Sequence, residues 1–264
     1  MVVRAARVAA RVTRHTDKVD VAGIVFQLSC PFPKPGFWAR NHPGFITRRR
    51  PDVTVRIDYE ERDGRHGWRS VGDTVADAAT VSRRGRNLRV STGYYRAAVD
   101  LPSGRVTVKM AAGFDVAGLM RTLTALWLAE RETLLVQAAC FGPTESATLA
   151  CGLPAWAIPS SATAGWFAVR PRADRVDVLA TPFLVGDYPP PANGWCATTL
   201  ALPGGKEPMS APEALRALLP SIWHADRRRL AVERTLDLAT RVVAALHCRE
   251  LDATDPATEG VAVG

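Results

Sequence analysis

The residue types that most often carry out chemistry are scattered along this chain of 264 residues. None of the five histidines has the HxxxH or HExxH spacing that places two imidazoles on one metal ion, and the five cysteines include no CxxC pair. Ser146 and the pair Ser160-Ser161 lack the GxSxG setting of an exposed nucleophile. Cys140 lies in an apolar run, where burial raises the pKa of a thiol rather than lowering it. We therefore predict no metal site, no disulfide framework and no catalytic residue among them.

The composition is that of a soluble globular protein, with 47% hydrophobic and 23% charged residues. No window reaches the roughly 18 uninterrupted apolar residues of a membrane-spanning helix. The first fourteen residues place an arginine at every third or fourth position, where a signal peptide needs an apolar run. We expect a cytoplasmic protein without a membrane span.

The positive charge is concentrated in the first part of the chain. The formal net charge is +8, but residues 1–110 hold 21 basic against 10 acidic residues, whereas residues 111–264 hold 13 against 16. Thirty of the 34 basic residues are arginine, which is typical of a GC-rich genome, so codon bias is one explanation and an anionic partner is the other. The arginine runs at 48–50 and 83–86 are not interleaved with aromatic residues, which argues against single-stranded nucleic acid.

Alternating apolar and polar residues predict that residues 1–110 form a β-rich region, a first domain of mostly antiparallel sheet. Pro102, Ser103 and Gly104 lie between two of the predicted strands and indicate a hairpin turn. The predicted strands are 19–30, 53–59, 87–91, 94–101 and 105–110.

Residues 111–264 form the second predicted domain, which mixes helices and strands. Apolar residues at helical spacing predict a helix over 115–131, and the continuous apolar run 133–141 predicts a buried strand. Gly142-Pro143 then ends the strand before a segment that we interpret as another helix, and 176–179 predicts a later strand. Ser210 and Glu213 have the spacing of a capping box at the start of a helix, and 228–248 predicts the last helix. The fold class is α/β in this domain and α+β for the whole chain.

The order of segments after residue 110 resembles the carboxy-terminal domain of the HPr kinase-like proteins, which are P-loop kinases related in fold to phosphoenolpyruvate carboxykinases. The closest matches are TPF at Thr181–Phe183 and SAPEALRALLP at Ser210–Pro220. In that family a strand ending in a Leu-His-Ala-like sequence precedes a small hairpin, a phosphate loop of the type GPSGSGKST and a strand with a Ser-Asp-Asp/Glu segment. The resemblance implies a P-loop α/β domain over residues 111–264.

The same resemblance implies that the kinase site has degenerated. Ala147 and Thr148 stand where the phosphate loop needs its second glycine and its lysine, and Glu145 adds a carboxylate that repels phosphate. Residues 163–165 replace the acidic segment, and Gln137 replaces the histidine. We therefore expect no bound ATP and no other cofactor at the degenerate loop, which comprises Gly142, Pro143, Thr144, Glu145, Ser146, Ala147 and Thr148.

These observations favour a catalytically inactive HPr kinase-like pseudokinase that acts as a protein-binding, scaffold or regulatory subunit, or that associates with itself. Candidate interface residues lie in Pro/Gly-rich segments, where they either face a partner or fold back onto the core: Phe37, Trp38, Tyr188 and Trp195. One alternative is an active ATP-dependent kinase of a peptide or small molecule, with Lys206, Arg170 or Arg172 replacing the missing lysine. A second alternative is binding of an anionic surface or nucleic acid through the basic amino-terminal half.

Overall fold

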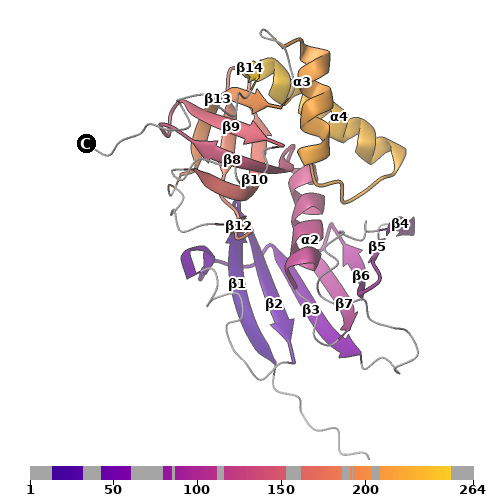
Figure 1. The fold of residues 1–264 in the computed structure, drawn as a ribbon. Helices are drawn as coiled ribbons and strands as arrows, with labels where there is room; N and C mark the ends of the chain where they lie inside the picture. Colours follow the sequence, from indigo (N-terminus) through magenta and orange to yellow (C-terminus); the bar gives the residue numbers. More distant parts are fainter. Residues whose placement is uncertain are drawn as a thin grey trace, which may run out of the picture.

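The chain forms two β-sheets and three α-helices in the part that the structure, a computed structural model, describes (Figure 1). The described residues are 14–31, 43–60, 80–84, 87–111, 116–152, 162–185, 191, 193–203 and 209–250. The helices are α2 (Val116–Glu130), α3 (Ala211–Leu218) and α4 (Arg229–Ala245), with short 3-10 turns η1 (Pro43–Phe45) and η3 (Leu219–Ser221). The mixed α and β class predicted from the sequence is confirmed.

The first sheet, sheet A, has seven strands in the order β1-β2-β3-β7-β6-β5-β4. The predicted strands at 53–59, 87–91, 94–101 and 105–110 are confirmed, with small changes at their ends. The strands are β1 His15–Val21, β2 Ile24–Cys30, β3 Val53–Glu60, β4 Thr80–Arg84, β5 Asn87–Ser91, β6 Tyr95–Asp100 and β7 Arg105–Ala111.

One sequence prediction for sheet A was wrong. The single strand expected over 19–30 is the antiparallel hairpin β1–β2, because Ala22 and Gly23 both have positive φ and the Asp20 carboxylate accepts a hydrogen bond from the Gly23 N–H at 2.8 Å. The prediction of a mostly antiparallel sheet is confirmed, since four of the six strand pairings are antiparallel. The exception is β3 at the centre, which pairs in parallel with both β2 and β7.

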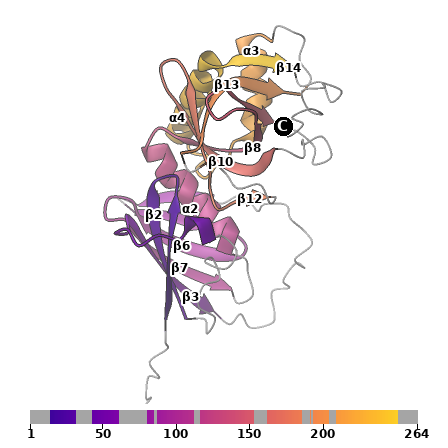
Figure 2. The same ribbon diagram turned by 90° about the vertical axis from the view of Figure 1, so that its left-hand side faces the viewer.

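Helix α2 completes the core of sheet A and confirms the helix predicted over 115–131. Alternate residues of the strands, such as Val55 and Ile57 of β3, are buried in one cluster with Leu119 and Leu123 of the helix. Burying apolar side chains of this size is the main force that holds a helix on a sheet. In Figures 1 and 2, α2 runs beside sheet A and reaches the second sheet.

The second sheet, sheet B, is formed by later strands and carries α3 and α4 on one face. Strand β11 pairs with both β10 and β13, so β8, β9, β13, β11 and β10 close into a ring. The predicted strands at 133–141 and 176–179 are confirmed. The strands are β8 Leu134–Phe141, β9 Ala147–Cys151, β10 Thr163–Pro171, β11 Val176–Leu179, β12 Leu184–Val185, β13 Trp195–Leu202 and β14 His247–Glu250.

Two helix predictions in sheet B need correction. The segment after Gly142-Pro143 is not a helix but strand β9, which returns antiparallel along β8. The helix predicted over 228–248 ends at Ala245, and residues 247–250 form β14, which pairs in parallel with β13. Threonine and alanine, which dominate residues 147–150, occur in both helices and strands, so pairing with a neighbouring strand decides that this segment is a strand.

Candidate functional site

The predicted phosphate loop is a tight turn between two strands. Phe141 pairs with Thr148 across the β8–β9 hairpin, and the Ser146 N–H donates to the Pro143 carbonyl at 3.1 Å. Gly142 has φ +93°, a conformation that glycine adopts without strain. The turn is therefore a β-hairpin, and it does not lead into a helix.

This hairpin has little to offer a phosphate group. A phosphate loop works because consecutive free N–H groups converge at the start of a helix. Here Ala147 and Thr148 are strand residues that face partners on β13, and the Thr144 carbonyl accepts a hydrogen bond from the Cys196 N–H at 2.7 Å. Glu145 is exposed at the tip. The turn thus presents a carboxylate where a phosphate ligand needs donors.

The arginines considered as replacements for a lysine lie at the wrong end of the sheet. Val169 pairs with Leu134 at the start of β8, so Arg170 and Arg172 are at the opposite end from the turn. The eight residues of β8 separate them by about 23 Å at the usual rise per strand residue. Arg170 and Arg172 therefore do not reach the hairpin, and Lys206 lies outside the described residues.

Among the four candidate interface aromatics, Phe37, Trp38 and Tyr188 lie outside the described residues. Trp195 is described, and its prediction as a surface anchor was wrong. It is only 7% exposed in β13 and packs edge-on against Phe167 with ring centroids 5.7 Å apart. Burial in the core of sheet B removes this side chain from any partner surface.

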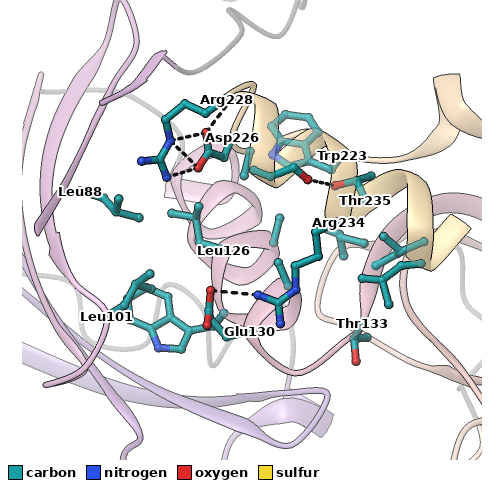
Figure 3. A pocket seen from close by; sticks show the side chains of 18 of the residues that line it. Leu88, Leu101, Leu126, Glu130, Thr133, Trp223, Asp226, Arg228, Arg234 and Thr235 are labelled. Carbon is teal, nitrogen blue, oxygen red and sulfur yellow. Dashed lines mark hydrogen bonds and ion pairs between the residues drawn. The ribbon is translucent and has the colours of Figure 1, made fainter. Parts of the chain in front are cut away.

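The structure instead contains an apolar pocket between the two sheets, which we call the docking groove (Figure 3). Its volume is about 720 Å³, and no single segment forms it, since sheet A, α2, β8, the segment between η3 and α4, and α4 all contribute walls. Leu88 and Leu101 line one side, Leu126 of α2 lies near the centre, and Trp223 lies on the other side. Leu230, in the first turn of α4, also belongs to the lining. Such an apolar concave surface is the usual form of a binding site.

Two ion pairs lie at separate ends of the docking groove, as Figure 3 shows. Arg228 Nε is 2.9 Å from Asp226 Oδ1, and hydrogen bonding to this carboxylate raises the pKa of Arg228 above its ordinary value. Arg234 Nη1 is 3.4 Å from Glu130 Oε1 and connects α4 to the end of α2. The Arg234–Glu130 pair is about half exposed and contributes little to stability, whereas the Asp226 carboxylate is only 10% exposed and holds Arg228 in place.

The first turn of α4 beside the groove has an unusual composition. Asp226 is followed by three arginines and then by Leu230, whose side chain is 80% exposed. No acidic residue lies in the first turn of this helix, although the positive end of a helix dipole favours acids there. An exposed leucine next to a cationic helix start contradicts local stability rules, and such contradictions concentrate at functional sites.

The sequence did not predict the groove because its walls come from four separate stretches of the chain, 83–88, 101–102, 125–135 and 222–238. The Arg-Arg-Arg-Leu sequence at 227–230 was the local feature that pointed to a site here, because basic residues at the start of a helix are electrostatically unfavourable. An amphipathic pattern over 228–248 was recognised, but it did not show that Leu230 faces away from the sheet B core.

The junction behind the groove is held by an aromatic cluster. Trp166 of β10 and Trp223 pack edge to face at 5.2 Å, and the Arg121 guanidinium of α2 lies 5.1 Å from the Trp223 ring and 5.8 Å from the Trp166 ring. Cation–π contacts of this kind stabilise by about 0.5–2 kcal/mol. This cluster connects α2 to both β10 and the segment before α4.

Comparisons with protein-family models, curated proteins and solved structures found no match to this chain. In the described ranges, no three His, Cys, Asp or Glu side chains gather as a metal site would require. Among the helices of those same ranges, none combines the length and hydropathy needed to span a bilayer.

Proposed function

We propose that this protein is a non-catalytic, HPr kinase-like binding subunit whose docking groove holds an apolar segment of another protein. The observation that carries the proposal is Leu230, which is 80% exposed beside an apolar groove of about 720 Å³. Exposed large hydrophobic side chains at the edge of an apolar pocket are typical of protein interaction sites.

The HPr kinase-like assignment is supported by the order of elements in sheet B. Strand β8 is followed by a small hairpin, and β9, β13 and β14 are then mutually parallel, as in α/β domains. On this assignment the hairpin at 142–146 corresponds to the small hairpin of the family, and the phosphate loop corresponds to the segment after β9. That segment, residues 152–161, reads GLPAWAIPSS and has one glycine and no lysine. Loss of ATP binding is therefore expected with either alignment.

The chemistry of the groove rim indicates an acidic amphipathic partner. Among the described residues that line the groove, three are arginines and two are acidic, and Arg227 and Arg229 lie next to it at the start of α4. Carboxylates flanking leucine anchors would meet this excess of guanidinium groups, which favours encounter and orientation more than affinity. We therefore expect a helix with one leucine face and glutamates along its edges.

Two synthetic helical peptides test this partner chemistry directly. One carries a leucine face flanked by glutamates, and the other has lysines in place of the glutamates. Fluorescence anisotropy should show saturable binding of the acidic peptide and at least tenfold weaker binding of the basic one. The Leu230→Ser variant should bind the acidic peptide at least tenfold more weakly, because the substitution removes the exposed leucine that anchors the peptide.

The matched control is Leu236→Ser, which changes another exposed leucine of α4 that does not line the groove. This variant should bind the acidic peptide like the parent. Equal binding of both peptides, or equal loss in both leucine variants, would show that the groove is not a docking site for acidic segments.

Titration calorimetry with ATP tests the loss of the kinase site. A phosphate loop makes ATP binding dependent on Mg²⁺, because its hydroxyl holds the metal. We expect no magnesium-dependent binding with a dissociation constant below about 100 μM, which corresponds to roughly 5.5 kcal/mol. Such binding, if observed, would restore the active-kinase alternative.

A second candidate function is supported by the outer face of sheet A. Alternation along the strands places five exposed basic side chains on the face away from α2: Arg56, Arg89, Arg96, Arg105 and Lys109. Arg96 and Lys109 are direct cross-strand partners, and Lys109 is paired on its other side with Asp58 of β3. A face of this kind would contact nucleic-acid phosphates without reading sequence.

Anisotropy with a labelled DNA duplex at 50 and 200 mM salt tests this second function. We expect weak binding that falls steeply with salt and does not depend on sequence. The double variant Arg96→Glu, Lys109→Glu should abolish it. Unchanged DNA binding by this charge-reversed protein would exclude the outer face of sheet A as the nucleic-acid binding surface.

A further inference from the structure

A second cavity, separate from the docking groove, is lined by four arginines. Its volume is about 860 Å³, and we call it the arginine cavity. Arg131 follows α2, Arg170 and Arg172 belong to the β10–β11 hairpin, and Arg241 lies near the end of α4. Among the lining residues that the structure describes, Glu132 is the single acidic one. Three separate segments therefore bring guanidinium groups together around one open space.

Arg170 is the member whose charge is least compensated. Its Nε donates to the Thr133 hydroxyl at 3.0 Å, and that hydroxyl donates to the Arg131 carbonyl, also at 3.0 Å. Thr133 is only 1% exposed, so it is a fixed support for the guanidinium. Within the described residues no carboxylate lies within 4.0 Å of Arg170. The side chain is half-buried, and an anion in the cavity would supply the missing charge.

The other three arginines have carboxylate partners that are weak or shared. Arg241 Nη1 is 3.5 Å from Glu132 and 3.9 Å from Asp237, and Arg131 Nη2 is 3.8 Å from Asp52. Arg172 Nε is 2.7 Å from Asp177, which also faces Arg175 at 3.6 Å. Exposed ion pairs of this kind stabilise a protein by only about 0–1 kcal/mol, so a multiply charged ligand can replace the carboxylates at low cost.

Glu132 is already an anion inside this arginine set. Its backbone has φ +52°, in the left-handed region, although glycine is the usual residue at such a helix end. The conformation places its carboxylate against Arg241. The cavity thus holds one carboxylate–guanidinium contact of the type that an external anion would make.

We propose that the arginine cavity binds a compact small-molecule anion with two or more carboxylate or phosphate groups, anchored by Arg170. Guanidinium forks match the planar geometry of carboxylates and the oxygens of phosphate, and four of them around one cavity favour a multiply charged ligand. This site lies beyond the proposed protein-binding function and uses none of the groove residues on which that function depends.

Titration calorimetry of the full chain with citrate and with pyrophosphate, without Mg²⁺ and at constant ionic strength, tests the proposal. We expect saturable binding of at least one of them and none of acetate at the same concentration. Equal affinity for citrate and pyrophosphate would mean that the cavity recognises negative charge alone. A preference for one of them would show whether it recognises carboxylate or phosphate groups.

Three variants make the test specific. Arg170→Gln and Arg241→Gln should each weaken binding at least tenfold, and Glu132→Gln should strengthen it about threefold because the competing carboxylate is gone. Arg216→Gln, which changes an exposed arginine of α3 outside the cavity, should bind like the parent. Absence of saturable binding at 5 mM, or the same affinity in the parent, Arg170→Gln and Arg241→Gln proteins, would overturn the proposal.

Discussion

Glu132 shows how a single residue ends a helix against its own conformational preference. The Thr133 N–H donates to the Leu128 carbonyl at 3.0 Å and the Glu132 N–H donates to the Ala129 carbonyl at 3.3 Å, which is the Schellman pattern. The motif requires a left-handed residue at position 132, where most L-residues are strained by about 1 kcal/mol or more.

Substitutions at Glu132 should therefore separate backbone strain from charge. Glu132→Val should lower the free energy of unfolding by about 1–2 kcal/mol, because a β-branched residue is strongly disfavoured at positive φ. Glu132→Gly should lose less than about 1 kcal/mol, since relief of strain offsets the lost exposed ion pair. Urea denaturation measures both, and equal losses in the two variants would contradict the role of the left-handed backbone.

The cysteines should differ in reactivity according to burial. Burial raises the pKa of Cys151 to about 12 and raises that of Cys140 still further, whereas Cys30 and Cys196 are partly exposed. We expect Ellman's reagent to label Cys30 and Cys196 in the native protein and to reach Cys140 and Cys151 only after unfolding. Rapid labelling of all five native thiols would contradict the buried positions of these two.

The same thiols should make the fold sensitive to alkali. In the unfolded chain they ionise near their ordinary pKa of 9.0, so above that pH the unfolded state binds fewer protons than the native state. The free energy of unfolding should therefore fall as pH rises from about 9 toward 12, by up to about 1.4 kcal/mol per pH unit for each buried thiol. Urea midpoints at pH 8, 9 and 10 check the direction, and Cys151→Ala should reduce the slope.

At the scale of elements, α3 is the helix whose start was most fully specified by local sequence. The Glu213 carboxylate accepts hydrogen bonds from the Ser210 N–H at 3.0 Å and from the Ser210 hydroxyl at 2.6 Å. These bonds lower the pKa of Glu213, so the stability they provide is present above its ordinary pKa of 4.5 and is lost as pH falls through the lowered value. The contacts are local in sequence, which is why the spacing alone predicted them.

Ser210→Ala should lower the urea midpoint at pH 7, because it removes the serine hydroxyl from the capping box. The loss should be smaller at pH 3, where protonated Glu213 no longer accepts the charge-assisted hydrogen bonds of the parent. Ser103→Ala, in an exposed turn, provides the control. An effect of equal size at both pH values would contradict the part played by the Glu213 charge.

The β8–β9 hairpin shows where element prediction failed. Residues 142–150 contain no residue that forbids a helix after Pro143, and the interpretation as a strand-to-helix turn followed from the Thr/Ala/Leu-rich composition after the glycine turn. The backbone instead pairs on two sides, with β8 and with β13, and β13 lies more than forty residues further along the chain. Pairing with so distant a strand leaves no signal in a local window.

At the scale of the whole molecule, α2 connects the two predicted domains. It was assigned with residues 111–264, yet Met120, Leu123 and Leu128 are buried in the same cluster as the strands of sheet A. Sheet A without this helix would expose an extended apolar face to water, which favours aggregation.

Two fragments test where the first folding unit ends. A fragment of residues 1–132 should be soluble and unfold cooperatively, because it contains α2 and its helix end. A fragment of residues 1–110 should aggregate or remain unfolded, because its apolar face has no cover. Circular dichroism with urea denaturation compares them, and cooperative unfolding of the shorter fragment would support the predicted boundary at 110.

The sequence by itself determined the elements whose signals are local. Alternation predicted β3, β5, β6 and β7, helical spacing predicted α2, and the Ser210–Glu213 spacing predicted the start of α3, since each depends on residues within one element. Only the tertiary structure decided the parallel centre of sheet A, the closed ring of sheet B, the burial of Trp195 and both cavities. These features depend on contacts between residues far apart in the chain, and the apolar or charged character of one side chain does not reveal its neighbours.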